Sequence, residues 1–234
     1  MMGRGLRRSR PVTLNENIMV YRELLKKAIP YYKKGRTGDV RHIQWLYYQL
    51  LKLRPVIKNK GYDFDILFAL TILHDVGYSR IQKPFDPFDL PIRKLHAQES
   101  ARIAREILNI AGFIRFKRKK TFKLIREHDA WAFKKPLQDP EWRIFSDLDF
   151  IWETSREGFD IVRRFLHQNR REFLNTVKQH YKNKKVTNPF FLSETEKLFI
   201  KKTKSHHTLK GVVCDRLLFL GLQKSKISDS SHHL

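Results

Sequence analysis

The sequence predicts an all-α fold. Apolar residues recur at intervals of three and four positions along most of the 234-residue chain, as at Leu46, Leu50 and Leu53, and this is the spacing of one face of a helix. Prolines fall between the periodic segments or at their first residues, where helices begin or end. No convincing ladder of alternating apolar and polar residues indicates a strand. We therefore expect helices and no sheet.

Eight segments have the helical spacing. In chain order they cover residues 40–53, 63–76, 96–111, 119–130, 140–154, 157–181, 193–203 and 208–221. A capping-box pattern, Ser193 with Glu196, supports a helix start at 193. Residues 79–93 contain three prolines and are expected to be irregular, either as a lid or substrate wall or as an ordinary surface connection.

We expect one helical domain over residues 13–222, because a chain with 41% hydrophobic residues can bury a sizeable core. The two ends, 1–12 and 223–234, are polar and rich in Arg or Ser, and we expect them to be disordered. The single cysteine, Cys214, excludes a disulfide framework or a thiolate metal cage within one chain.

Compartment and partners follow from charge and hydropathy. The basic N-terminus is followed by no apolar signal region, and no apolar run approaches the roughly 20 residues that span a bilayer. A cytoplasmic protein without a membrane partner is the simplest expectation. Lys and Arg number 48 against 24 Asp and Glu, a net charge of +24 that attracts polyanions such as nucleic acid. A solvated basic surface would have the same composition, so the charge permits a nucleic-acid partner without establishing one.

Four histidines lie on the apolar faces of separate expected helices: His42, His74, His96 and His128. His74 is followed directly by Asp75, at the end of the apolar run 66–73. A single inward histidine is usually a hydrogen-bonded core residue, and His180, which also follows an apolar stripe, is the warning that such a residue can be incidental.

A divalent metal would explain the whole set. The four histidines, Asp75 and the acidic pair Asp147 and Asp149 would otherwise need many mutual hydrogen bonds, whereas one or two ions would satisfy them together. Mixed imidazole and carboxylate ligands suit Mn, Fe, Co, Ni or Zn, and the carboxylates also permit Mg.

Four sequence segments in this order carry a family resemblance: LFALTILHDVGYSR, KLHAQESARIAREIL, LIREHDAW and FSDLDFIWE. Together they resemble the HD-domain superfamily of metal-dependent phosphohydrolases over about residues 20–155. The resemblance implies an HD-domain helical bundle with additional C-terminal helices at about 157–221. These helices would cap the core or mediate homo-oligomerisation.

The resemblance also implies a ligand set. In that superfamily the first His, the His-Asp pair and a late Asp hold one ion, which corresponds here to His42, His74, Asp75 and an acid of the pair 147/149. Two intervening histidines, here His96 and His128, help to bind a second ion.

Helical spacing does not decide which late acid is the metal ligand, since Asp147 and Asp149 flank the apolar stripe equally. The family pattern favours Asp149 and makes Asp147 a supporting residue or an alternative ligand. Both could instead be surface acids that face lysines.

The expected catalytic residues are Asp75, His96 and His128. With two ions, a hydroxide between them could attack phosphorus in line, and Asp75 would be the bridging carboxylate. With one ion, a metal-activated water would need a base, and His96 or His128 could serve.

Phosphate contacts are less well defined. Many family members carry a lysine after His-Asp-x-Gly, where this chain has Tyr78, which can donate a hydrogen bond but adds no charge. Arg41, Arg80 and Lys94 are the alternative candidates, and each could be a simple surface charge. The Gly-Tyr-Pro signature of the subgroup that degrades cyclic dinucleotides is absent.

We therefore expect a metal-dependent phosphohydrolase that cleaves a phosphoester of a nucleotide or a related small phosphate through a metal-activated hydroxide. The alternatives are a basic nucleic-acid-binding protein with a structural or relict metal site, and a catalytically silent helical scaffold.

Overall fold

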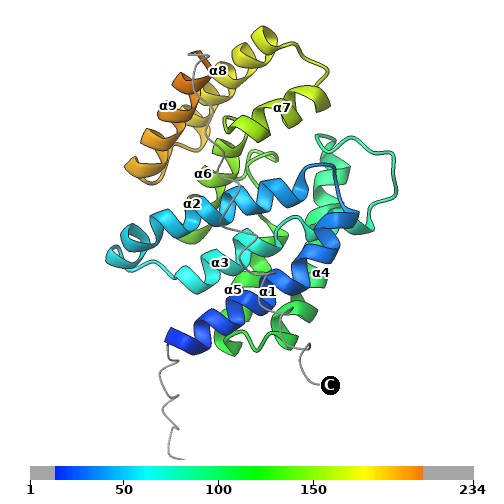
Figure 1. The fold of residues 1–234 in the computed structure, drawn as a ribbon, viewed down its shortest axis with the longest axis vertical. Helices are drawn as coiled ribbons and strands as arrows, with labels where there is room; N and C mark the ends of the chain where they lie inside the picture. The colour runs from blue at the N-terminus through cyan, green and yellow to red at the C-terminus, as the bar shows by residue number, and fades with distance from the viewer. Residues whose placement is uncertain (1–13, 208–234) are drawn as a thin grey trace, which may run out of the picture.

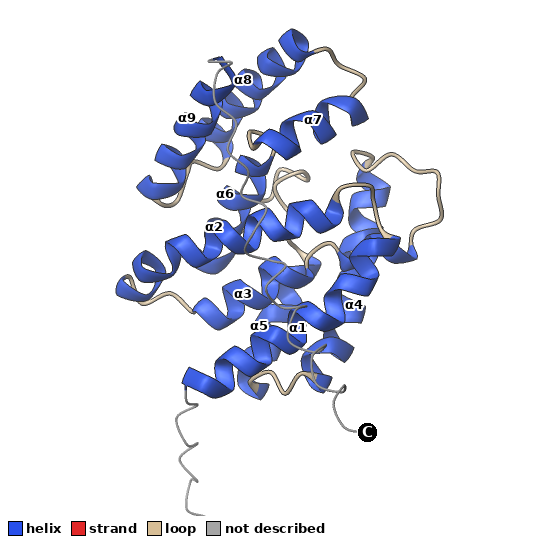
Figure 2. Ribbon diagram, viewed as in Figure 1, coloured by secondary structure: helices blue, strands red, loops and turns tan. Residues whose placement is uncertain are grey.

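Helices form almost all of the described chain. The computed structural model describes residues 14–207, which form nine α-helices and one short 3-10 helix, with no strand among these residues (Figure 2). The all-α class is confirmed. The predictions for residues 1–12, 208–221 and 223–234 lie outside the described residues.

Most helices follow one another with short connections, and the longer ones are 81–89 and 127–139 (Figure 1). In chain order they are α1 (Leu14–Lys34), α2 (Asp39–Asn59), α3 (Phe64–Leu73), the 3-10 helix η1 (Val76–Arg80), α4 (Leu90–Ile110), α5 (Arg115–Arg126), α6 (Pro140–Trp152), α7 (Arg156–Phe165), α8 (Arg170–Thr187) and α9 (Ser193–His207).

Helix α3 is central, with contacts to α1, α2, α4, α5 and α6 (Figure 1). Every residue of α3 except Asp65 is buried, as expected for a helix that is apolar on all sides. The Asp63 carboxylate caps its first turn by accepting hydrogen bonds from the backbone N–H groups of Asp65 and Ile66. The pair His74 and Asp75, which follows this buried helix, therefore lies in the interior.

The single helix expected at 157–181 is wrong, because this segment forms α7 and α8. His167, between them, has a positive φ of 53°, which interrupts the helical path. A capping box then starts α8. The Asn169 side chain accepts from the Glu172 N–H, and the Glu172 carboxylate accepts from the Asn169 N–H. The apolar spacing continues through the break, so spacing alone missed it.

Three further expectations are corrected near the N-terminal end. Pro30 and Pro55 lie inside α1 and α2, where only the last turn follows them, so each helix loses little backbone hydrogen bonding. Helix α1 was not among the expected segments, although Leu24 and Ala28 are buried at helical spacing. The irregular stretch is shorter than 79–93, because α4 already begins at Leu90.

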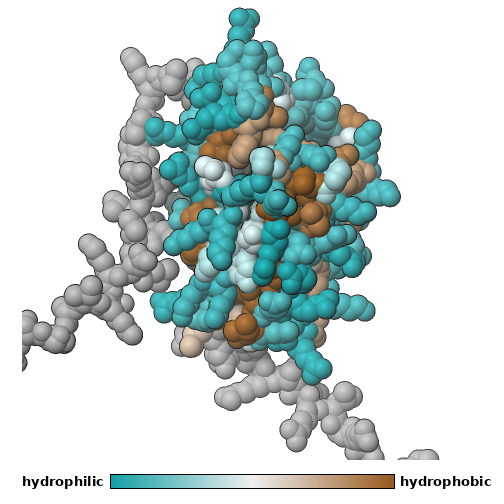
Figure 3. Space-filling model, turned by 90° about the vertical axis from the view of Figure 1, so that its right-hand side faces the viewer, coloured by the Kyte–Doolittle hydropathy of each residue, from teal (hydrophilic) through white to brown (hydrophobic). Residues whose placement is uncertain are grey.

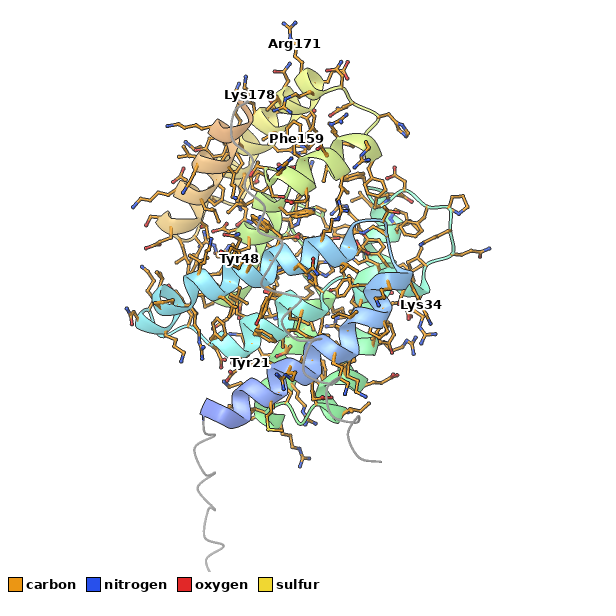
Figure 4. The ribbon with its side chains drawn as sticks, in the orientation of Figure 1. Tyr21, Lys34, Tyr48, Phe159, Arg171 and Lys178 are labelled. Carbon is orange, nitrogen blue, oxygen red and sulfur yellow. The ribbon has the colours of Figure 1, made fainter. Side chains whose placement is uncertain are left out.

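The C-terminal helices pack against α6 of the same chain. Ile151 of α6 forms an apolar cluster with Phe159, Phe173, Val177 and Phe199 of α7, α8 and α9. The rings of Phe159 and Phe173 meet edge to face with centroids 4.8 Å apart. On the outer side of α8, Arg171 and Lys178 are exposed and point away from the core (Figure 4).

The visible surface is mostly hydrophilic, with small hydrophobic patches between polar side chains (Figure 3). Among the helices of residues 14–207, none combines the length and the apolar character that crossing a bilayer would require.

Candidate metal centre

Six of the residues predicted from the sequence come together around the C-terminal end of α3. They are His42 of α2, His74 and Asp75 at the junction of α3 and η1, His96 of α4, His128 just after α5, and Asp149 of α6. The four histidines and Asp75 are buried. The side chain of Asp149 is 21% exposed, so the cluster opens toward solvent on the α6 side.

Asp75 is the centre of the cluster, and its two oxygens face different histidines. Oδ2 lies 3.3 Å from Nε2 of His74 and 3.7 Å from Nδ1 of His42. Oδ1 lies 3.2 Å from Nε2 of His96 and 3.4 Å from Nε2 of His128. Asp75 forms one group with His42 and His74 and a second group with His96 and His128. Each group is compact enough to hold a metal ion.

Backbone carbonyls orient three of the imidazoles. Nδ1 of His74 lies 3.0 Å from the Thr71 oxygen, Nδ1 of His96 lies 3.2 Å from the Ile92 oxygen, and Nδ1 of His128 lies 2.8 Å from an oxygen of the preceding turn. Because a carbonyl can only accept, each Nδ1 must carry the proton and donate it. Nε2 then offers its lone pair toward Asp75, which is the tautomer that a metal ligand needs.

Several nitrogens of the cluster lack the partners that burial demands. Nε2 of His42 and Nε2 of His74 are buried and lie 3.0 Å and 3.3 Å from carboxylate oxygens of Asp149 and Asp75, but neither contact has the geometry of a hydrogen bond. Nε2 of His96 and Nε2 of His128 lie 3.0 Å apart. With both Nδ1 atoms protonated, two lone pairs would face each other there unless a proton or a cation lies between them. The donor set therefore fits one or two divalent ions.

Gly77 explains how η1 brings Asp75 so close to α4. A Cβ at this position would lie 2.1 Å from the backbone oxygen of His96 and 2.5 Å from the backbone nitrogen of Ser100. The Gly77 N–H instead donates to the Ser100 hydroxyl at 2.8 Å. Only glycine permits this approach of two backbones, so the residue places Asp75 and His96 within contact distance.

The structure separates the two late acids. Asp149 Oδ1 lies 3.0 Å from Nε2 of His42 and 3.8 Å from Nε2 of His74. Asp147 faces the opposite way, toward α8 and α9, and its carboxylate lies 2.9 Å from Lys184 Nζ and accepts from the Thr195 hydroxyl at 2.7 Å. Asp147 is thus placed to join α6 to the C-terminal helices and does not reach the histidine cluster.

Electrostatics favour an anionic centre. Burial opposes ionisation of Asp75, but the charge of Arg36 and contacts with His74 and His128 hold its pKa well below the usual range. Burial lowers the pKa of His96. Burial would also lower the pKa of His128, but Asp129 and Asp75 outweigh it and raise the pKa to about 9.

The phosphate candidates are dispersed. Tyr78 is buried beside the cluster, where its ring stacks on His96 with centroids 3.9 Å apart. Arg41, Arg80 and Lys94 are exposed, and none of them lines the cavity that opens from the cluster. Their role in binding phosphate stays a prediction.

Sequence reasoning missed the arginines that do face the cavity. Arg36, in the turn between α1 and α2, donates to Asp75 and to Asp39, and its guanidinium lies 3.8 Å from the centroid of the Tyr78 ring. Arg93, one turn before His96 on α4, lies 3.0 Å from Asp129. A signal existed for Arg93, since positions three apart share a helix face. Arg36 lies in a turn and follows no periodicity.

A cavity of about 340 Å³ connects the cluster to solvent. His42, Asp75, His128 and Asp149 line it at one end. Pro87 and Phe88 of the connection 81–89 form part of its wall, so this connection takes the place that a substrate wall would occupy. The volume is within the range of roughly 300–1,000 Å³ that is typical of small-molecule sites.

In the comparisons with known proteins, no family model, no curated protein and no solved structure matches this chain.

Proposed function

We propose that this protein is an HD-type metal-dependent phosphohydrolase that acts on a nucleotide or a related small phosphoester. The observation that carries the proposal is the division of Asp75 between two histidine pairs. His42, His74, Asp75 and Asp149 would hold one ion, and Asp75 with the other histidine pair would hold the second. Backbone carbonyls also fix the orientation of three of the imidazoles, as the partners of metal-ligating histidines commonly do.

Divalent ions held there would act as Lewis acids on a phosphoryl group and would activate water as the nucleophile. The chain's own residues supply the remaining requirements. Asp75 stays ionised because of its lowered pKa, so it is available as a ligand at neutral pH. Arg36 and Arg93 bring two positive charges to the cavity and would attract phosphoryl oxygens. Phe88 and Trp131 line the cavity and are partly exposed, so they would restrict the entry of water.

The experiment that tests the proposal is turnover by metal-reconstituted protein. Untagged protein would be freed of metal, reloaded with Mn²⁺ or Fe²⁺, and assayed against phosphomonoesters, phosphodiesters and nucleotides. We expect turnover of at least one class and its loss in Asp75→Asn. Folded, metal-loaded protein that hydrolyses none of these substrates would contradict the proposal.

A second candidate, nucleic-acid binding, is favoured by one observation. Four exposed cations follow one face of α5 at helical spacing: Arg115, Lys119, Lys123 and Arg126. Such a row could follow a phosphate backbone. This candidate predicts RNA or DNA binding that weakens steeply with salt and survives His74→Ala in folded protein. Salt-independent or absent binding would leave the row as a solvated surface.

A further inference from the structure

The cavity beside the cluster has a second end that the C-terminal helices build. Helix α7 lines it with the apolar residues Ile161, Val162 and Phe165, and α8 lines it with polar residues that include His180 and Asn183. In Figure 1, α7 and α8 lie beyond α6, on the side away from α1 and α5. The His and Asp ligands belong to the other helices, so the two ends differ in chemistry.

At this second end of the cavity, a histidine–glutamate pair connects α8 with the end of α6. Nδ1 of His180 on α8 lies 3.0 Å from Oε2 of Glu153, which follows directly after α6. An ionised carboxylate can only accept, so the His180 N–H donates and its Nε2 is the ring nitrogen available to a ligand. The hydrogen bond from His180 to Glu153 raises the pKa of His180, which favours a second donor at Nε2.

Glu153 has a second oxygen whose hydrogen-bonding capacity is unused. The side chain is 13% exposed, and Oε1 is buried with no hydrogen-bond partner among the described residues. A buried carboxylate oxygen without a donor costs free energy, and a bound hydroxyl or N–H group would remove that cost. His180 and Glu153 therefore present a donor and an acceptor side by side, in a cavity that α7 lines with apolar residues.

The pair lies at the right place for the non-phosphate part of a substrate. Glu153 follows Asp149 by four residues and keeps a helical backbone conformation, so the two Cβ atoms are about 5–6 Å apart. Trp152 stacks on His42 with ring centroids 5.0 Å apart and so forms a flat aromatic surface between the two ends. A phosphoester with its phosphorus at the cluster would extend its leaving group along this surface toward Glu153.

We infer that Glu153 and His180 form a leaving-group subsite that binds a nucleoside through its hydroxyl or base N–H groups, with the ring against the apolar residues of α7. The inference deepens the proposed phosphohydrolase activity and rests on it for the identity of the leaving group. It also assigns the C-terminal helices a role, since α8 would supply substrate recognition. A cavity of about 340 Å³ suits a mononucleotide better than a polymer.

Nucleosides that lack phosphate test the subsite separately from catalysis. We would titrate adenosine, guanosine, cytidine and uridine into full-length protein by calorimetry, with NMR of the His180 ring as a second readout. We expect at least one nucleoside to bind and to shift this ring, and Glu153→Gln to weaken binding at least 10-fold. The matched control is Glu157→Gln, an exposed glutamate outside the cavity. Wild-type protein that binds none of the four nucleosides would overturn the inference.

Kinetics distinguish the subsite from a structural role. For metal-loaded protein we would compare kcat/KM for the matching nucleoside monophosphate with that for p-nitrophenyl phosphate, whose leaving group has neither sugar hydroxyls nor a base. Glu153→Gln and His180→Asn should lower this ratio at least 10-fold through KM, whereas the exposed control His167→Asn should leave it unchanged. Equal losses for both substrates would overturn the subsite. Nucleoside binding without any hydrolysis would overturn the phosphohydrolase proposal alone.

Discussion

Asp147 and Asp149, two residues apart on α6, should have opposite effects when each is replaced by asparagine. Asp147→Asn removes the counter-charge of Lys184, whose side chain is only 5% exposed. Breaking a buried ion pair from one side costs about 3–5 kcal/mol. For a chain of this size 1 kcal/mol corresponds to about 2–4 °C in Tm, so we expect Tm to fall by about 6–20 °C, with bound metal unchanged.

The asparagine at 147 would keep an amide oxygen for the Thr195 hydroxyl, which favours the lower end of that range. Burial raises the pKa of Asp147 in spite of Lys184, which indicates that the intact pair adds little net stability. The cost therefore comes from the orphaned ammonium group. The double variant Asp147→Asn/Lys184→Met should recover more than half of the lost stability.

Asp149→Asn should instead lower the bound metal and leave the stability almost unchanged. Its side chain is 21% exposed and keeps water as a partner, so we expect the metal-free protein to lose no more than about 1 kcal/mol. Bound metal should fall by about one equivalent. Urea unfolding and elemental mass spectrometry of all three variants provide the measurements. Loss of metal in Asp147→Asn with stability intact would refute the separation of roles.

Three further predictions concern the surroundings of the cluster. Gly77→Ala should lower the free energy of unfolding by about 1–3 kcal/mol or more, and metal content with it, because its Cβ would lie 2.1 Å from the His96 backbone oxygen. An unchanged free energy of unfolding would refute this close approach. His180 should titrate above its ordinary pKa in NMR and return toward it in Glu153→Gln. The stability that protonated His180 adds is complete below about pH 6.5 and is lost as pH rises through its raised pKa. Equal titration midpoints of His180 in wild type and in Glu153→Gln would exclude the pair. Arg93→Gln should raise KM for phosphoesters about 10-fold, because one charge-assisted hydrogen bond to the substrate would be lost. An unchanged KM would place Arg93 outside the substrate site.

Sequence patterns predicted the features that depend on local spacing. The apolar run of α3 has no polar face, so burial of the pair His74 and Asp75 at its end followed directly. The histidines at 42 and 96 lie on helical stripes and therefore point the same way as the core residues around them. Spacing could not choose between the acids at 147 and 149, because both flank the stripe and the choice depends on which helices pack on each side.

The missed features depend on contacts between distant segments. Arg36 lies in a turn, and its role follows only from the approach of the α1–α2 connection to η1. His180 was treated as an incidental inward histidine, because its partner Glu153 is 27 residues away and belongs to another helix. The break at His167 depends on one backbone dihedral angle that apolar periodicity does not report.

The most direct test of the metal centre is the metal content of untagged wild-type protein and of Asp75→Ala, measured by elemental mass spectrometry after reconstitution. Asp147→Asn is the matched control, since this acid faces away from the cluster. We predict about two equivalents in wild type and in the control, and close to none in Asp75→Ala, because both ligand groups share this carboxylate. Folded wild-type protein that takes up no divalent metal would contradict the proposed centre and the hydrolase built on it.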